Sequence, residues 1–162
     1  MVLIFAINMP DVPLMTDDDY MREALTEGTK ALPLCLPNPP VGCVVVLSGQ
    51  IVGRGHTQRP GASHAEVGAL NATRCDLADA TLFVTLEPCS FQGRTPACAD
   101  AIIARGIRKV VVAIADPDPR NNGAGIRKLE DAGVEVRLGV LAKVAQAQLG
   151  PYLNLPANKL PA

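Results

Sequence analysis

Apolar residues recur along this chain with two different periods, and the two kinds of segment alternate. Short, mostly apolar runs are typical of strands, whereas apolar residues at every third or fourth position mark one face of a helix. The strand-like runs are CVVVLSGQIVGRGH (43–56, two runs joined at a Ser-Gly turn), ATLFVTLEP (80–88), RKVVVAIAD (108–116) and VEVRLG (134–139). The helix-like segments are TDDDYMREALTEGTKAL (16–32), HAEVGALNAT (64–73), TPACADAIIARG (95–106), GAGIRKLEDAG (123–133) and LAKVAQAQL (141–149).

Local start signals sharpen two of the helix predictions. Thr16 is a suitable N-cap for a helix that begins at about Asp17, because three aspartates follow it in the first turn. Prolines from Pro33 onward end this helix. Thr95 and Pro96 predict the start of another helix, with the threonine as N-cap and the proline at the first helical position.

The alternation of strands and helices predicts an α/β fold, a three-layer αβα sandwich with a mixed sheet of about five strands. The hairpin centred on Ser48-Gly49 should be antiparallel, and the later strands should be parallel through helical crossovers. We expect one domain over residues 16–150, a leader over 1–15 and an extended C-terminal strap over 151–162. In such sheets ligands bind beyond the carboxyl ends of the strands, where helices begin.

Composition narrows the functional classes. The chain has 162 residues, 48% of them hydrophobic, no tryptophan and a net charge of −1. No basic block or stripe is present, so we expect no nucleic-acid partner. The apolar run over residues 1–9 is too short to span a bilayer and lacks the charged start of a signal peptide, so we expect no membrane partner. Five cysteines do not suit a secreted disulfide framework, and we predict a cytoplasmic protein.

Two of the five cysteines stand out. Cys89 directly follows a predicted strand and Cys98 lies in the first turn of the next predicted helix, with eight residues between them. A disulfide, two buried thiols and two metal ligands are all compatible with this pair alone. Cys43 lies within a strand-like run and is expected to be a small buried residue. Cys35 and Cys75 flank loops and are expected to be plain thiols.

His64 offers a third metal ligand. It precedes another predicted helix, so His64, Cys89 and Cys98 would meet at two helix N-termini that favour thiolate over thiol. Three such ligands suit zinc and leave a fourth position for water. A structural zinc closed by a fourth protein ligand is the alternative, but Cys75 lies at the far end of the predicted helix. Glu66 could take a proton from a zinc-activated water and deliver it to a leaving amine.

These residues form a known signature. His64-Ala65-Glu66 followed by Pro88-Cys89 and Cys98 resembles the cytidine deaminase-like superfamily, whose zinc deaminases carry H-x-E and P-C…C. The wider spacing of the two cysteines departs from the C-x2-C of cytidine deaminases. Together with NPPVGCVVV, HTQRPGASHAE, LEPCSFQGRTPAC and ADPDP, it is similar to the deaminase half of bacterial riboflavin-biosynthesis deaminase/reductases, over about residues 16–140.

The resemblance implies a cytidine deaminase-like fold and a specific reaction. The reaction is the zinc-dependent hydrolytic removal of the 2-amino group from 2,5-diamino-6-ribosylamino-4(3H)-pyrimidinone 5′-phosphate. It also implies that Asn38 and His56 contact the ring and that Arg94 binds the phosphate. We further expect a homo-oligomer. The chain stops soon after the deaminase half should end, so the first hypothesis is a deaminase that lacks a fused reductase.

Two positions depart from the family pattern. Phe91 stands where the family usually has histidine, and Asp118 stands where it usually has asparagine, in D-P-N-P. Phe91 removes a polar contact, and Asp118 would repel a phosphate that it faced. Two alternatives therefore stay open. One is a related zinc deaminase that acts on another aminopyrimidine, nucleobase or nucleoside. The other is a non-catalytic paralogue, against which Glu66 argues.

Overall fold

The computed structural model describes residues 13–93 and 95–153, which form five strands, five α-helices and one short 3-10 helix. The strands are β1 (Gly42–Leu47), β2 (Gln50–His56), β3 (Thr81–Leu86), β4 (Lys109–Ile114) and β5 (Glu135–Leu138). The helices are α1 (Asp17–Thr29), α2 (Ala65–Asn71), α3 (Cys98–Ala104), α4 (Ala124–Asp131), α5 (Ala142–Leu149) and the 3-10 helix η1 (Gly150–Tyr152).

The strands form one mixed sheet in the order β2-β1-β3-β4-β5. β1 pairs antiparallel with both β2 and β3, whereas β3, β4 and β5 are parallel to one another. The predicted hairpin, the parallel crossovers and the number of strands are therefore confirmed. The carboxyl ends of β3 and β4 lie at the same edge of the sheet because these strands are parallel and adjacent.

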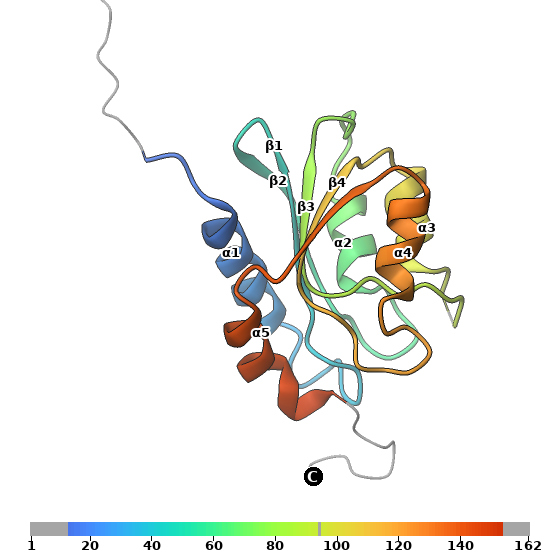
Figure 1. Cartoon of the computed structure of the whole chain (residues 1–162). Coiled ribbons are helices and arrows are strands. Elements are labelled where there is room, and N and C mark those ends of the chain that lie inside the picture. The colour runs from blue at the N-terminus through green and yellow to red at the C-terminus, as the bar shows by residue number, and fades with distance from the viewer. Residues whose placement is uncertain (1–12, 94, 154–162) are drawn as a thin grey trace, which may run out of the picture.

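Helices cover both faces of the sheet, as the αβα prediction requires. Figure 1 shows α1 and α5 on one face, and α2, α3 and α4 on the other. The middle strands read as almost continuous apolar runs because both of their faces are covered, and all of the residues Val110–Ala113 have no exposed surface. The core is aliphatic, with Phe83 the largest fully buried side chain.

The first helix begins as its sequence predicts. Thr16 is the N-cap, and its hydroxyl accepts a hydrogen bond from the Asp19 backbone N–H while the Asp19 carboxylate accepts one from the Thr16 N–H. This reciprocal pair is a capping box, which satisfies two otherwise unpaired donors. α1 ends at Thr29, four residues before Pro33.

Two predicted boundaries differ from the structure. α3 begins at Cys98 with Ala97 as its N-cap, so Thr95 and Pro96 precede the helix instead of starting it. The C-terminal strap is not extended at its start, because residues 150–152 form η1. The rest of the strap and most of the predicted leader lie outside the described residues. No helix among the described residues is long and apolar enough to cross a membrane.

Candidate active site

A cavity of about 280 Å³ opens at the carboxyl ends of β3 and β4. Its wall combines the loop before β1, the start of α2, the segments after β3 and β4, and the residues around η1. The cavity therefore lies where parallel strands end and helices begin, the position at which α/β sheets bind ligands.

Three potential metal ligands form a cluster beside the cavity, and two of them, His64 and Cys89, line it. His64 is the N-cap of α2, Cys89 lies three residues beyond the end of β3, and Cys98 is the first residue of α3. Their ligand atoms lie within 4.8 Å of one another. His64 Nδ1 is 3.2 Å from the sulfur of Cys98 and 3.8 Å from that of Cys89.

The spacing of this cluster fits zinc. With Zn–S of about 2.3 Å and Zn–N of about 2.0–2.1 Å, tetrahedral angles place sulfur and nitrogen ligands about 3.5 Å apart. The two distances from His64 Nδ1 lie on either side of that value. One imidazole and two thiols form a donor set that suits zinc better than it suits magnesium or calcium. Cys75 is exposed and lies outside the cluster, and Cys35 and Cys43 are buried free thiols, as expected.

Hydrogen bonds around Cys89 favour a negative charge on its sulfur, which would attract a cation. Hydrogen bonding from the Cys98 thiol, together with hydrogen bonds from His64 and from the Cys98 backbone N–H, lowers the pKa of Cys89 to about 4. The backbone donor is the first N–H of α3 and lies 3.1 Å from the Cys89 sulfur. These contacts favour the thiolate form of Cys89, and thiolate is the form of cysteine that binds metals.

Glu66 lies beside the cluster in the first turn of α2. It is 4% exposed and lines the cavity. Burial raises the pKa of Glu66 to about 7. A carboxyl group with a pKa near neutrality can both accept and return a proton, which is what general acid–base catalysis requires.

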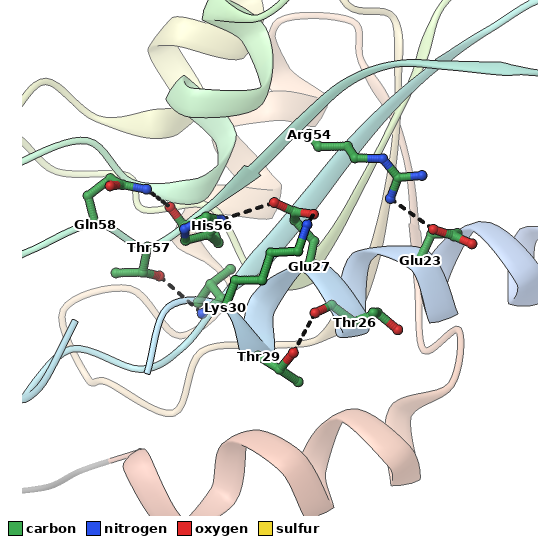
Figure 2. A network of polar contacts seen from close by, with 10 residues as sticks. Glu23, Thr26, Glu27, Thr29, Lys30, Arg54, His56, Thr57 and Gln58 are labelled. Carbon is green, nitrogen blue, oxygen red and sulfur yellow. Dashed lines mark hydrogen bonds and ion pairs between the residues drawn. The ribbon is translucent and has the colours of Figure 1, made fainter. Parts of the chain in front are cut away.

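The three residues to which the resemblance assigned substrate contacts have different places. Asn38 lines the cavity. Arg94 lies outside the described residues. His56 is not among the described lining residues; its ring faces α1, where Nδ1 lies 3.0 Å from the Glu27 carboxylate (Figure 2). Its neighbour Thr57 lines the cavity instead, and the Thr57 hydroxyl is bonded to the backbone at Pro39 and Val41.

The His56 contact belongs to a polar network on the α1 side of the sheet (Figure 2). Glu27 also accepts a hydrogen bond of 2.8 Å from Lys30, and Arg54 pairs with Glu23 at the same distance. Burial, the largest influence, raises the pKa of Glu27, but hydrogen bonds from Lys30 and His56 outweigh it, so the net pKa is lowered. This network joins α1 to β2 and lies apart from the metal cluster.

Glu87 holds the wall of the cavity together, a role that sequence reasoning missed. This carboxylate is 3% exposed and accepts four backbone hydrogen bonds, from the N–H groups of Asp116, Gly123, Gly125 and Ile126. Two of these donors belong to the first turn of α4, whose dipole favours a negative charge. Glu87 therefore ties the end of β3, two residues before Cys89, to the loop between β4 and α4. The sequence LEPC carried no local signal of this long-range role.

The two residues that depart from the family pattern both line the cavity. Phe91 and Asp118 are joined there by Arg120. The guanidinium of Arg120 lies 4.7 Å from the centre of the Phe91 ring and binds the Asp118 carboxylate, with Nη2 2.6 Å from Oδ2. Sequence reasoning considered each departure separately and did not single out Arg120.

The chain is similar to known zinc-binding deaminases. Residues 14–114 match the family model of the cytidine and deoxycytidylate deaminase zinc-binding region. The riboflavin biosynthesis protein RibD of Aquifex aeolicus is 49% identical over 149 residues, covering 86% of this chain and 42% of that protein. RibD of Escherichia coli is 46% identical over 132 residues, covering 82% and 36%.

Solved structures give the same picture. Acinetobacter baumannii RibD superposes with a TM-score of 0.82 at 39% identity, covering 90% of this chain and 41% of that one. A Thermotoga maritima diaminohydroxyphosphoribosylaminopyrimidine deaminase/5-amino-6-(5-phosphoribosylamino)uracil reductase has a TM-score of 0.80 at 40% identity, covering 84% and 40%. The chain thus spans about two fifths of the length of these relatives. The matched family region contains His64, Glu66 and both clustered cysteines, so this chain belongs to the cytidine and deoxycytidylate deaminase family.

Proposed function

We propose that this chain is a zinc-dependent aminohydrolase that deaminates 2,5-diamino-6-ribosylamino-4(3H)-pyrimidinone 5′-phosphate in riboflavin biosynthesis. The reaction consumes one water, replaces the 2-amino group of the pyrimidine by oxygen and releases ammonia. The observation that carries the proposal is a buried Glu66 beside His64, Cys89 and Cys98 at one cavity. The names of the similar proteins, which include a diaminohydroxyphosphoribosylaminopyrimidine deaminase, support this substrate class.

The metal cluster would activate the attacking water. We assign His64 Nδ1 and the sulfurs of Cys89 and Cys98 as the protein ligands of one zinc ion. When bound, zinc supplies Lewis acidity that makes water a nucleophile near neutral pH. The three ligands come from rigid positions at helix starts and a strand end, so they hold the reacting centre at a fixed place in the cavity.

Glu66 moves the protons. Its carboxylate accepts a proton from the attacking water, and the same carboxyl group then donates a proton to the departing amine. Burial favours this proton transfer because it raises the pKa of Glu66 to about 7, near neutral pH, where the group can both accept and donate a proton. Glu87 also lines the cavity, but it is engaged by four backbone donors and so is not assigned a role in proton transfer.

Substrate binding is assigned to residues of the cavity wall and of the loop between β3 and α3. Asn38 offers an amide donor and acceptor from the cavity wall, which suits the edge of a pyrimidine ring. Arg94 keeps the phosphate role that the family resemblance gives it. We leave His56 out, because its ring binds Glu27. A cytoplasmic homo-oligomer remains a prediction.

Ammonia release tests the proposal. The zinc-loaded chain is incubated with the phosphorylated diaminopyrimidine, its dephosphorylated riboside, cytidine and deoxycytidylate, and ammonia is measured alongside chromatography of the product. We expect the phosphorylated diaminopyrimidine to be turned over with the highest kcat/KM. Turnover of cytidine or deoxycytidylate alone would overturn the assignment of substrate while leaving the zinc chemistry in place.

A second candidate is a zinc deaminase of another aminopyrimidine. The observation in its favour is that Phe91 and Asp118, the two departures from the family, both line the cavity. If they alter recognition of the sugar phosphate, the substrate is a different aminopyrimidine with the same amidine-like carbon. The same panel separates the two candidates.

A further inference from the structure

Three side chains from two loops form a single cluster at the cavity. Phe91 lies in the loop between β3 and α3, which also carries Cys89, whereas Asp118 and Arg120 lie in the loop between β4 and α4. The Arg120 guanidinium stacks on the Phe91 ring, with its carbon 4.7 Å from the ring centre. Its Nε donates to both oxygens of Asp118, at 3.1 and 3.2 Å, and Nη2 donates to Oδ2 at 2.6 Å.

This cluster holds an arginine in place although its side chain is 71% exposed. A free arginine samples many rotamers, and fixing it costs about 2 kcal/mol of side-chain entropy. Here the Asp118 carboxylate fixes one edge of the guanidinium and the Phe91 ring covers one face. Asp118 is itself anchored, because its Oδ1 also accepts the Arg120 backbone N–H at 2.9 Å and its own N–H donates to Asp116.

One edge of the guanidinium is left over. The hydrogen bonds of Arg120 within the described residues use Nε and Nη2, and Nη1 has no acceptor among those residues. Arg120 lines the cavity, and a free guanidinium edge is suited to an oxyanion, because its parallel N–H groups can bind two oxygens of a phosphate. The cation–π contact with Phe91 keeps that edge from turning away.

The cluster also resolves a conflict of charge. An aspartate facing the cavity would repel a phosphorylated substrate, since like charges about 4–6 Å apart disfavour each other. Arg120 pairs with that aspartate through both of its bonded nitrogens, so the pair has no net charge and still presents N–H donors. Phe91 and Asp118 are thus parts of one arrangement that positions a cation.

We propose that Arg120 is a specificity-determining residue that binds the phosphate of the substrate through its free edge, held in place by Phe91 and Asp118. This inference rests on the proposed function for the identity of the substrate but not for the chemistry of recognition, which is that of a sugar phosphate. Arg120 acts on binding and not on the chemical step, because it belongs to the loop after β4 and not to the metal cluster.

Steady-state kinetics on the zinc-loaded chain give the first test. Arg120→Ala should raise KM for the phosphorylated diaminopyrimidine at least fivefold and leave kcat within twofold, while kcat/KM for the dephosphorylated riboside stays within twofold. Arg120→Lys, which keeps the charge but not the fork, should fall between the wild type and Arg120→Ala. Adding Asp118→Asn to Arg120→Ala should recover part of the lost affinity, because it removes the uncompensated charge.

The control is Arg137→Ala. Arg137 is a β5 arginine paired with Asp17, and it does not line the cavity. This variant should match the wild type in every assay. Zinc content and circular dichroism are measured for all variants, so that loss of the site or of the fold is recognised as such.

A binding measurement separates this inference from the proposed function. Ribose 5-phosphate is titrated into the wild type, Arg120→Ala and Arg137→Ala, and its 31P resonance is followed. We expect saturable binding to the wild type and to Arg137→Ala, and at least fivefold weaker binding to Arg120→Ala. If the diaminopyrimidine is not a substrate but this pattern holds, the proposed function fails and the role of Arg120 stands.

Two outcomes would overturn the role of Arg120. One is equal affinity of ribose 5-phosphate for the wild type and Arg120→Ala, or no saturable binding to either. The other is a KM that rises equally for the phosphorylated and dephosphorylated compounds, which would show that Arg120 shapes the cavity without reading the phosphate.

Discussion

The two sides of the cavity are built in different ways. The metal side, formed by His64, Glu66, Cys89 and Cys98, comes from helix starts and a strand end and is mostly withdrawn from solvent. The substrate side, formed by Asn38, Phe91, Asp118 and Arg120, comes from loops and includes a side chain that is 71% exposed.

This difference separates chemistry from selectivity. Rigid elements hold the groups of the metal side, where small displacements cost large factors in rate. On the substrate side, Phe91, Asp118 and Arg120 are positioned by contacts with one another, so they can differ from the family while the metal ligands keep their places. We expect substitutions on the metal side to abolish activity and substitutions on the substrate side to redirect it.

The largest effect should come from the metal ligands. Cys89→Ala and Cys98→Ala each remove one of three ligands, so zinc measured by mass spectrometry should fall from about one ion per chain to a small fraction. Thermal stability should fall with it, because the cluster joins α2, α3 and the end of β3. Cys75→Ala, which removes an exposed thiol outside the cluster, is the matched control. Stoichiometric zinc in both ligand variants would contradict the assignment.

Glu66→Gln should lower turnover without changing zinc binding or stability. Glutamine keeps the size and hydrogen-bonding capacity of the side chain but cannot shuttle a proton, so kcat should fall at least about 100-fold on the substrate that proves active. Zinc content and unfolding temperature should stay near the wild-type values. A variant that turns over at the wild-type rate would rule out Glu66 as the proton shuttle.

Glu87→Gln should damage both sides through the structure. It replaces a carboxylate that accepts four backbone hydrogen bonds with an amide whose N–H2 faces donors, so the free energy of unfolding should fall by about 2–4 kcal/mol. Denaturant unfolding measures this loss. Glu130→Gln, an exposed change in α4, should stay within about 0.5 kcal/mol of the wild type. Equal stabilities of the two variants would show that the carboxylate is not a structural anchor.

His56→Gln should have the smallest effect, because the imidazole faces Glu27 and not the cavity. KM should stay within about twofold of the wild type, while the loss of one hydrogen bond should cost about 1 kcal/mol of stability. A KM increase of tenfold or more would place His56 at the substrate after all.

The pH dependence of stability tests the same network. The pKa of Glu27 is lowered from its ordinary value of 4.5, so the ionised Glu27 carboxylate, through its contacts, stabilises the fold above that value. This stabilisation is lost as the pH falls through the lowered pKa. The stability difference between the wild type and His56→Gln should therefore shrink below pH 4.5. A difference that stays constant in acid would show that the Glu27 contact is not its source.

The parts of the molecule that sequence predicted correctly depend on local rules. The capping box of Thr16 needs only residues within one turn, and apolar runs identify buried strands wherever they pair. The meeting of His64 with the two cysteines also followed from local positions, because helix starts and strand ends gather at one edge of a parallel sheet.

The boundary of α3 shows where local rules fail. Thr95 and Pro96 form a good start signal, yet the helix begins at Cys98. The first N–H groups of α3 are occupied by the neighbouring loop: the Cys98 N–H donates to the Cys89 sulfur and the Ala99 N–H donates to the Cys89 carbonyl. Cys89, in the loop between β3 and α3, thus caps this helix, and a tertiary contact overrides the local signal.

The substrate side was harder to predict for the same reason. Successive residues in a strand point to opposite faces, so which of His56 and Thr57 reaches the cavity depends on a one-residue register at the end of β2. Glu87 binds backbone groups that lie at least 29 positions away in the sequence, and Arg120 contacts Phe91, which is also 29 positions away. No periodicity or motif in either segment marks such contacts.

The hydrogen bonds from main-chain N–H groups to Glu87 have an evolutionary consequence. Four bonds hold the two ends of the connection between β4 and α4 by backbone N–H groups, at Asp116 and at Gly123 with the first turn of α4, and none of these bonds uses the side chain of Asp118 or Arg120. Mutation can therefore exchange residues such as Asp118 and Arg120 without unfolding the segment that bears them. A single buried carboxylate thus makes this connection a place where new binding preferences can arise while the metal side stays intact.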